Sequence, residues 1–298
     1  MFGILNLFKP AGPTSRDCVN QIQRLIRPIK VGHAGTLDPI AEGVLLIGVG
    51  QAARLVDWIH QLPKTYRGTF ELGKTSLSAD SETEITVLPD SSVPILHDIE
   101  SVLPEFRGKI SQIPPIYSAI RIDGKRAYES ARAGQAVEMP SREIIIHRLS
   151  IVEYEYPKLV LDIECSTGTY IRSLGRDMAR RLGSDAVMTA LNRTSIGELL
   201  SSEAVRMEQL DSRLAVAERL INPARCLSIF PQVSLDDHEI LRLQQGKTIE
   251  LLGLEKCALS SHPECVLALD RTGVLRSILY RNELQHWRPH RNFQESTS

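Results

Sequence analysis

The segment from Lys30 to Gly43, with the apolar run at residues 44–47 that follows it, constrains the fold of this 298-residue chain most. The segment holds one His, one Asp and three glycines, and its apolar residues follow no regular period. Such a composition is typical of a loop in which backbone shape matters more than burial. The apolar run predicts a buried strand that holds this loop in place. Because Asp38 precedes Pro39, we expect Asp38 in extended backbone outside any helix, although an Asp-Pro pair alone also fits a simple turn.

Strand and helix patterns alternate along the rest of the chain without regular repetition. Residues 64–72 alternate polar with apolar side chains, as in a half-buried antiparallel strand. Further strands are expected at residues 3–7 and 159–165. Expected helices are one capped by Thr14 or Ser15 and stopped by Pro28, and others over residues 51–60, 169–182 and 206–220. This mixture predicts an α+β fold with a mixed, largely antiparallel sheet and flanking helices.

The chain is long enough for two domains, and its composition changes near residues 222–231. Beyond that point, apolar runs at 265–269 and 274–280 flank Asp270–Gly273, which is a spacing that fits a β-hairpin. We expect one domain over residues 1–228 and a small all-β domain over residues 229–298. Residues 114–142 are rich in polar residues and glycine and indicate an excursion from the sheet of the first domain.

The charge distribution is more informative than the net charge of −1. Residues 9–30 and 172–193 are predominantly basic, whereas residues 77–105 hold seven acids and no Lys or Arg. Such segregation permits one basic face on a neutral protein, although each basic segment alone also fits a solvated helix face.

Five scattered cysteines without C-x-x-C spacing argue against a disulfide framework or a zinc site. Since the chain shows no signal peptide and no apolar run of membrane-spanning length, we expect a cytoplasmic protein without a membrane span.

Five blocks between residues 6 and 174 resemble, in order, the motifs of the TruB family of tRNA pseudouridine synthases. Residues 32–43 match the catalytic-loop pattern G-H-x-G-x-L-D-P-x-A-x-G at every fixed position. The remaining blocks are similar to the family's K-P-x-G-x-T-S (9–15), K-x-Y-x-G…L-G-x-x-T (64–75), Q-x-P-P-x-Y-S-A (112–119) and G-T-Y-I-R-[ST]-L (168–174). The C-terminal segment resembles, more weakly, the RNA-binding PUA domain that ends bacterial members.

The resemblance implies a pseudouridine synthase fold that isomerises uridine to pseudouridine at position 55 in the T-loop of tRNA, without cofactor or metal. It implies that Asp38 is the reactive carboxylate, that Arg172 is its cationic partner and that Tyr66 is the platform under the flipped base. Arg172 as a phosphate contact and Tyr66 as a sheet-core aromatic are the alternatives from residue type alone.

The remaining site residues implied by the resemblance bind substrate or support the loop. Tyr170 contacts base or ribose, Leu191 forms an apolar wall, His33 holds the RNA loop open, and Lys9 with Pro10 supports the catalytic loop. The T-stem phosphates are assigned to five basic residues: Arg121, Lys125, Arg126, Arg132 and Arg142. The expected partner is tRNA, bound through its T-stem loop by a monomer without an obligate protein partner.

The sequence departs from the family pattern at a few positions, but none of these is a residue to which the resemblance assigns a catalytic role. Ala34 and Glu42 replace frequent Thr or Ser residues, and the segment Ser78–Thr83 only loosely follows T-x-T-x-D-x-x-G.

Two other interpretations remain. Residues 48–53 match the dinucleotide fingerprint G-x-G-x-x-A, but no further βα repeats follow. A tRNA-binding or tRNA-folding protein with a vestigial site is the alternative from a different class.

Overall fold

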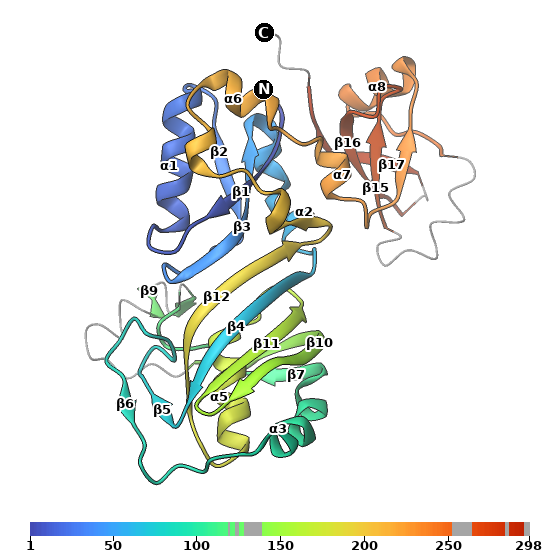
Figure 1. Cartoon of the computed structure of the whole chain (residues 1–298). Coiled ribbons are helices and arrows are strands. Elements are labelled where there is room, and N and C mark those ends of the chain that lie inside the picture. Colours follow the sequence, from blue (N-terminus) through green and yellow to red (C-terminus); the bar gives the residue numbers. More distant parts are fainter. Residues whose placement is uncertain (119, 123–124, 128–138, 252–263, 284–285, 295–298) are drawn as a thin grey trace.

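The computed structural model describes residues 1–118, 120–122, 125–127, 139–251, 264–283 and 286–294. Its main feature is a nine-stranded sheet that runs the length of the first domain (Figure 1). The strand order is β1-β3-β12-β4-β11-β10-β7, with β2 paired to β3 and β13 to β12. The strands of this sheet are β1 (Gly3–Lys9), β2 (Val31–Ala34), β3 (Ala41–Val49), β4 (Lys64–Leu72), β7 (Gly108–Gln112), β10 (Arg142–Glu155), β11 (Lys158–Cys165), β12 (Ala186–Ile196) and β13 (Leu199–Leu200).

All pairings in this sheet are antiparallel except that of β3 with β12. The prediction of a mixed, largely antiparallel α+β fold is confirmed, and the doubly wound sheet of a dinucleotide-binding enzyme is excluded. Close approach of β3 to β12 requires glycine at position 43, where φ is +105° and a Cβ atom would lie 2.3 Å from the carbonyl oxygen of Arg193.

Helices cover the sheet at both ends. The apolar face of α1 (Ser15–Ile26) packs on β1 and β3, and the Thr14 side chain caps its first turn in a capping box with Asp17. At the other end, α5 (Ile171–Arg181) packs on β4 and β12, beside α3 (Leu96–Val102) (Figure 1). Smaller elements are η1 (Gly50–Leu55), α2 (Val56–Ile59), β5 (Lys74–Thr75), β6 (Thr86–Val87), η2 (Leu103–Phe106), η3 (Ser201–Glu203), η4 (Met207–Gln209), α6 (Arg213–Glu218) and α7 (Pro223–Cys226).

Three expected elements differ from those observed. The loop expected over residues 30–43 is shorter, because residues 31–34 form β2 against β3, which itself begins at Ala41. The helix expected over residues 51–60 is instead a 3₁₀ segment followed by one α-helical turn. The helix expected over residues 206–220 is broken, since Leu210 is non-helical and Ser212 caps a new, shorter helix.

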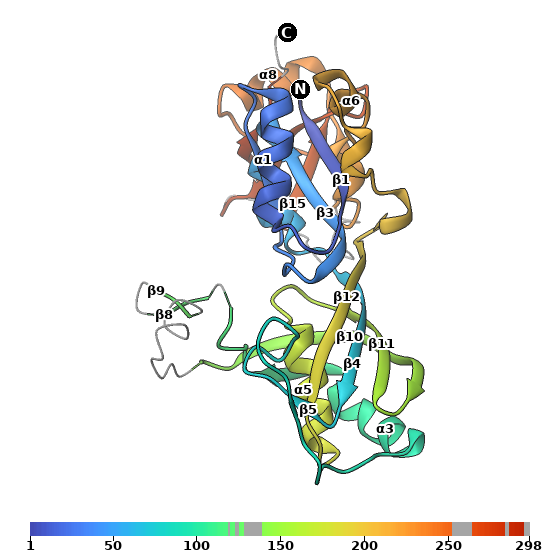
Figure 2. The ribbon, with the colours of Figure 1, turned by 60° about the vertical axis from the view of Figure 1, so that its left-hand side comes forward.

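Within the excursion at 114–142, the structure describes a small hairpin of β8 (Arg121–Ile122) and β9 (Lys125–Arg126). This hairpin projects from the body of the domain (Figure 2). Arg132 lies outside the described residues. None of the described helices is long and apolar enough to cross a membrane.

The C-terminal segment forms a separate four-stranded sheet that shares a hydrophobic core with the first domain. The sheet contains β14 (Gln232–Ser234), β15 (Cys265–Leu269), β16 (Leu275–Arg281) and β17 (Trp287–Asn292), with α8 (Asp237–Gln244) packed beside it. One buried cluster contains Ile4, Val44, Phe230, Ile278 and Phe293 together. Since these residues come from both parts, the two parts pack as one unit.

Replacing Phe293 with Ala should therefore destabilise both parts of the chain together. Phe293 is 1% exposed and stacks on Phe2 with ring centroids 5.4 Å apart. Truncating a buried Phe costs about 3–5 kcal/mol of unfolding free energy. Urea unfolding followed separately by Trp58 and Trp287 fluorescence should show both transitions moving to lower urea concentration.

The exposed Leu214→Ala substitution on α6 serves as the control and should leave both transitions in place. A Phe293→Ala shift confined to the Trp287 signal would contradict the shared core.

Candidate active site

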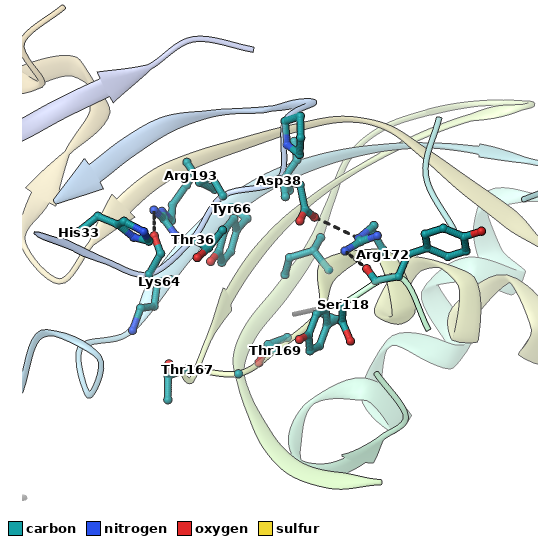
Figure 3. Close-up of a pocket in the computed structure, with 18 of the residues that line it drawn as sticks. His33, Thr36, Asp38, Lys64, Tyr66, Ser118, Thr167, Thr169, Arg172 and Arg193 are labelled. Carbon is teal, nitrogen blue, oxygen red and sulfur yellow. Dashed lines mark hydrogen bonds and ion pairs between the residues drawn. The ribbon is translucent and has the colours of Figure 1, made fainter. Parts of the chain in front are cut away.

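A cleft of about 720 Å³ opens where the 35–40 loop meets the first turn of α5. Its walls come from segments far apart in the sequence, which the sheet order brings side by side (Figure 3). The lining includes His33, Asp38, Lys64, Tyr66, Tyr117, Ser118, Thr169, Tyr170, Arg172, Leu191 and Arg193.

Hydrogen bonds from α1 and β1 hold the backbone around Asp38. The Ser15 hydroxyl accepts from the Leu37 amide at 2.9 Å and lies 3.2 Å from the Leu37 carbonyl oxygen. The Lys9 ammonium, which is fully buried, donates to the carbonyl oxygens of Ala41 at 2.6 Å and Pro39 at 3.4 Å. Lys9 also donates to the Pro10 carbonyl oxygen at 2.9 Å. Lys9 and Pro10 thus lie behind the loop, and the backbone on both sides of Asp38 is fixed.

Arg172 faces Asp38 from the first turn of α5. Its Nε lies 3.1 Å from Asp38 Oδ2, and its side chain is only 5% exposed (Figure 3). The helix can approach the sheet because residue 175 is glycine, where a Cβ atom would lie 2.1 Å from the Phe70 ring. Nη2 donates to the Tyr117 carbonyl oxygen at 3.1 Å, so the guanidinium has little freedom to turn.

A second carboxylate, Asp80, binds the other end of the same guanidinium. Asp80 Oδ2 lies 2.9 Å from Arg172 Nη1, and the Asp80 side chain is fully buried. The Ser78 hydroxyl and the Glu82 amide donate to Asp80 Oδ1 at 2.5 and 2.9 Å. Arg172 therefore bridges two carboxylates, one buried and one facing the cleft.

Asp80 has no role predicted from the sequence. The one pattern that points to it is the Asp of the motif that segment 78–83 loosely matches. Its position depends on Ala79, which has a φ of +59°, and on the bridge between Asp80 and Met188 of β12. Neither feature is visible in the pattern of residue types.

Asp38 is held in a balance between burial and surrounding charge. Burial raises the pKa of the Asp38 carboxyl above its usual value, Arg172 opposes this and Asp80 adds to it. Lys9 and Arg193 also favour the ionised form. About one-third of the side chain (34%) stays exposed, on the open side of the cleft, while protein surrounds the rest. The carboxylate is thus reachable but costs free energy to ionise.

Tyr66 and Leu191 lie on the adjacent strands β4 and β12, where Leu191 pairs with Gly68, two residues beyond Tyr66. Both line the cleft, Tyr66 half-buried and Leu191 6% exposed. Tyr170 occupies the N-cap position of α5. Its backbone amide donates to Gln112 Oε1 at 2.8 Å, and Gln112 Nε2 donates to its carbonyl oxygen at 3.0 Å. The Arg142 guanidinium lies 5.2 Å from the Tyr170 ring centroid, a cation–π distance.

His33 lies on β2 at the far side of the cleft from Arg172 (Figure 3). Burial lowers the pKa of the His33 imidazole, and the charges of Arg16 and Arg193 lower it further. Both effects favour the neutral form of the His33 imidazole. Close by, burial lowers the pKa of the Lys64 ammonium to about 8.

The structure places Lys9 and Pro10 behind the Asp38 loop and brings the predicted catalytic and base-contacting residues to one cleft: His33, Asp38, Tyr66, Tyr170, Arg172 and Leu191. Within the described residues, no group of three or more His, Cys, Asp or Glu side chains has an arrangement that could hold a metal ion. Arg193, which is 1% exposed and lines the cleft, is a second residue of the site without a role predicted from the sequence.

Comparison with known proteins identifies relatives over most of the chain. The family model of "TruB family pseudouridylate synthase (N terminal domain)" matches residues 23–171. The chain is 41% identical to a tRNA pseudouridine synthase B of Rhodopirellula baltica, covering 82% of this chain and 74% of the relative. It is 34% identical to one of Dehalococcoides mccartyi, covering 98% and 97%.

Solved structures share the fold at low sequence identity. A Cbf5-Nop10-Gar1 complex contains a chain that matches with a TM-score of 0.70 at 23% identity, covering 94% of this chain and 78% of that one. An H/ACA RNP bound to a substrate RNA containing 2′-deoxyuridine gives a TM-score of 0.72 at 20% identity, covering 98% and 85%.

Replacing Asp38 with Asn should stabilise the protein at pH 7. Because the pKa of Asp38 is raised in the folded state, ionising Asp38 costs more free energy in the folded protein than in the unfolded chain, and its charge at pH 7 weakens the fold. Asn removes that cost, so Tm should rise at pH 7. This rise in Tm over the wild type should shrink as pH falls from the pKa of Asp38 in the folded protein to its pKa in the unfolded chain, about 3.9.

Asp162→Asn is the matched control of opposite sign, because the hydrogen bond from Arg67 lowers the pKa of Asp162. It should lower Tm at pH 7. An Asp38→Asn protein that melts below the wild type at pH 7 would contradict the balance described for Asp38.

Proposed function

Since this chain belongs to the TruB family of pseudouridylate synthases, we propose that it converts uridine to pseudouridine at position 55 in the T-loop of tRNA. The enzyme is an isomerase of uridine in tRNA, as are the relatives named tRNA pseudouridine synthase B. In the reaction the N1–C1′ bond breaks, the uracil turns, and C5 bonds to C1′. The hydrogen on C5 is lost, and N1 gains one.

The observation that supports this function best is the pairing of Asp38 with Arg172 at the cleft. An ionised carboxylate is required whether it attacks the sugar, adds to the base or removes a ribose proton. Arg172 favours that ionised form and, at 3.1 Å, fixes the direction of the carboxylate. The fixed backbone around Asp38 keeps the carboxylate in place while the base moves.

The target base must leave its stack to reach Asp38, at a cost of about a few kcal/mol. Tyr66 and Leu191 offer an aromatic and an apolar surface on which the extruded uracil can rest. Tyr66 also brings a hydroxyl for proton transfer at C5. Tyr170, with Arg142 stacked on its ring, is placed to contact base or ribose.

Neutral His33 suits stacking or hydrogen bonding that holds the RNA loop open, rather than acid–base chemistry. The T-stem phosphates are assigned to Arg142 and the basic residues of the β8–β9 hairpin, which projects beside the cleft-bearing domain.

For the C-terminal domain, residues 229–298, we propose a PUA-like role in binding tRNA. Arg271, Arg281 and Arg288 are exposed on it, whereas Arg276 is paired with Asp270 at 2.6 Å. The exposed cations suit phosphate contacts. The proposed species is a cytoplasmic monomer that takes tRNA as its partner through the T-stem loop.

A tRNA-folding protein with a vestigial site is not favoured. The fully buried Asp80 holds the Arg172 guanidinium against Asp38, and an arrangement with this desolvation cost is not expected to persist in a site without activity.

Pseudouridine formation on an unmodified tRNA transcript tests the proposal directly. With tritium on C5 of uridine, the wild-type protein should release one tritium per tRNA, and replacing uridine 55 by cytidine should abolish release. Asp38→Asn should reduce the rate by more than about 100-fold, since acid–base help alone is worth roughly 10²–10⁴.

The Kd of the Asp38→Asn protein for tRNA should stay near the wild-type value, because shape is retained. Release from the cytidine-55 transcript would overturn the assignment of position 55. An Asp38→Asn rate within about 100-fold of wild type would overturn the role of Asp38.

A further inference from the structure

Arg193 is a fully buried cation that connects the loop of Asp38 to the strand of Tyr66. It lies on β12, where it pairs across the sheet with Tyr66 of β4 and with Gly43 of β3. Its Nε donates to the Val44 carbonyl oxygen at 2.7 Å, and Nη2 donates to the Gly35 carbonyl oxygen at 3.1 Å. Arg193 therefore holds both ends of the segment that carries Asp38.

The charge of Arg193 is not needed for these backbone bonds. No carboxylate in the described part of the chain forms an ion pair with Arg193. Two further buried cations, Lys9 and Lys64, lie near enough for Arg193 to lower the pKa of both ammonium groups. Burying a cation that has no direct ion-pair partner beside two like charges is unfavourable, and a neutral amide could supply hydrogen-bond donors too. The charge itself must then serve the site.

The groups that benefit are Asp38 and Tyr66. Tyr66 lies directly opposite Arg193 on the neighbouring strand β4. Burial raises the pKa of the Tyr66 hydroxyl, and the positive charge of Arg193 opposes that rise. The same positive charge favours the ionised form of Asp38.

We propose that Arg193 is a positioning residue that fixes the Asp38 loop beside Tyr66 and whose positive charge stabilises the Asp38 carboxylate in the same cleft. This inference rests on the proposed uridine isomerisation and adds a residue to that site. Arg193 acts through Asp38 and Tyr66, the two side chains proposed to meet the substrate.

The test compares Arg193→Gln, which keeps donors but loses charge, with Arg193→Lys, which keeps charge but loses the two-directional reach of the guanidinium. Arg67→Gln is the matched control: Arg67 lies on β4 next to Tyr66 but is exposed and paired with Asp162. Single-turnover rates with saturating enzyme are measured from low to neutral pH, beside the Kd for tRNA.

Arg193→Gln should lower the plateau rate by about 100-fold, the scale of a small misplacement of reacting groups, and leave the Kd close to wild type. The acid limb of its pH–rate profile, which is the fall of the single-turnover rate at low pH, should move to higher pH. Loss of a cation raises the pKa of Asp38, so the carboxylate takes up its proton at higher pH. The other groups that face Asp38 stay unchanged: Arg172 from α5, Asp80 from segment 76–83, Lys9 from β1 and Tyr66 from β4.

Arg193→Lys should lower the plateau but keep the acid limb near the wild-type position. Arg67→Gln should change neither. A merely structural role for Arg193 would lower the fraction of active enzyme without moving the limb. An unmoved limb in Arg193→Gln, or a wild-type plateau in Arg193→Lys, overturns the proposal. If Arg193→Gln does not fold, the Lys plateau alone decides.

Discussion

The contact on which the site depends is the bridge that Arg172 makes between Asp38 and Asp80. A lone buried carboxylate takes up a proton, and a lone buried guanidinium is costly, so each group needs the other. Two acids for one arginine leave Asp38 less than fully compensated, and burial together with Asp80 keeps its pKa raised. Arg172 thereby fixes the direction of the Asp38 carboxylate. Because the positive charge of Arg172 is shared with Asp80, it compensates the Asp38 charge only in part, and the carboxylate stays reactive.

The same region shows why the backbone around Asp38 can hold a reactive group. Ser15 fixes Leu37, Lys9 fixes Pro39 and Ala41, and Arg193 fixes Gly35 and Val44. Each of these side chains comes from a helix or strand of the large sheet layer. The loop buries Leu37 and packs Ile40 against the core, and these side-chain hydrogen bonds tie its backbone to the elements around it. Lys9 and Arg193 also bring positive charge close to the acid, so the residues that support the loop set its electrostatics too.

How far the sequence predicts this structure depends on whether a feature is local. Strand β4 follows from strict alternation over residues 64–72, and the capping box at Thr14 follows from its own few residues. Asp38, Arg172 and Tyr66 were predicted through family motifs and meet in one cleft. Asp80 could not be placed, because its position follows from the positive φ of Ala79 and a bridge to β12. The core shared by Phe2 and Phe293 joins opposite ends of the chain, and no local pattern encodes such a contact.

The most direct test of the shared arginine is the pH–rate profile of Asp80→Asn, measured in single turnover beside Asp185→Asn. Asp185 is also a buried acid paired with an arginine of α5, Arg180, but it lies outside the cleft. Loss of the Asp80 charge should lower the pKa of Asp38, moving the acid limb to lower pH. It should also lower the plateau rate, because Arg172 loses an anchor. Asp185→Asn should do neither. An Asp80→Asn enzyme with an unmoved acid limb and a wild-type plateau would contradict the account.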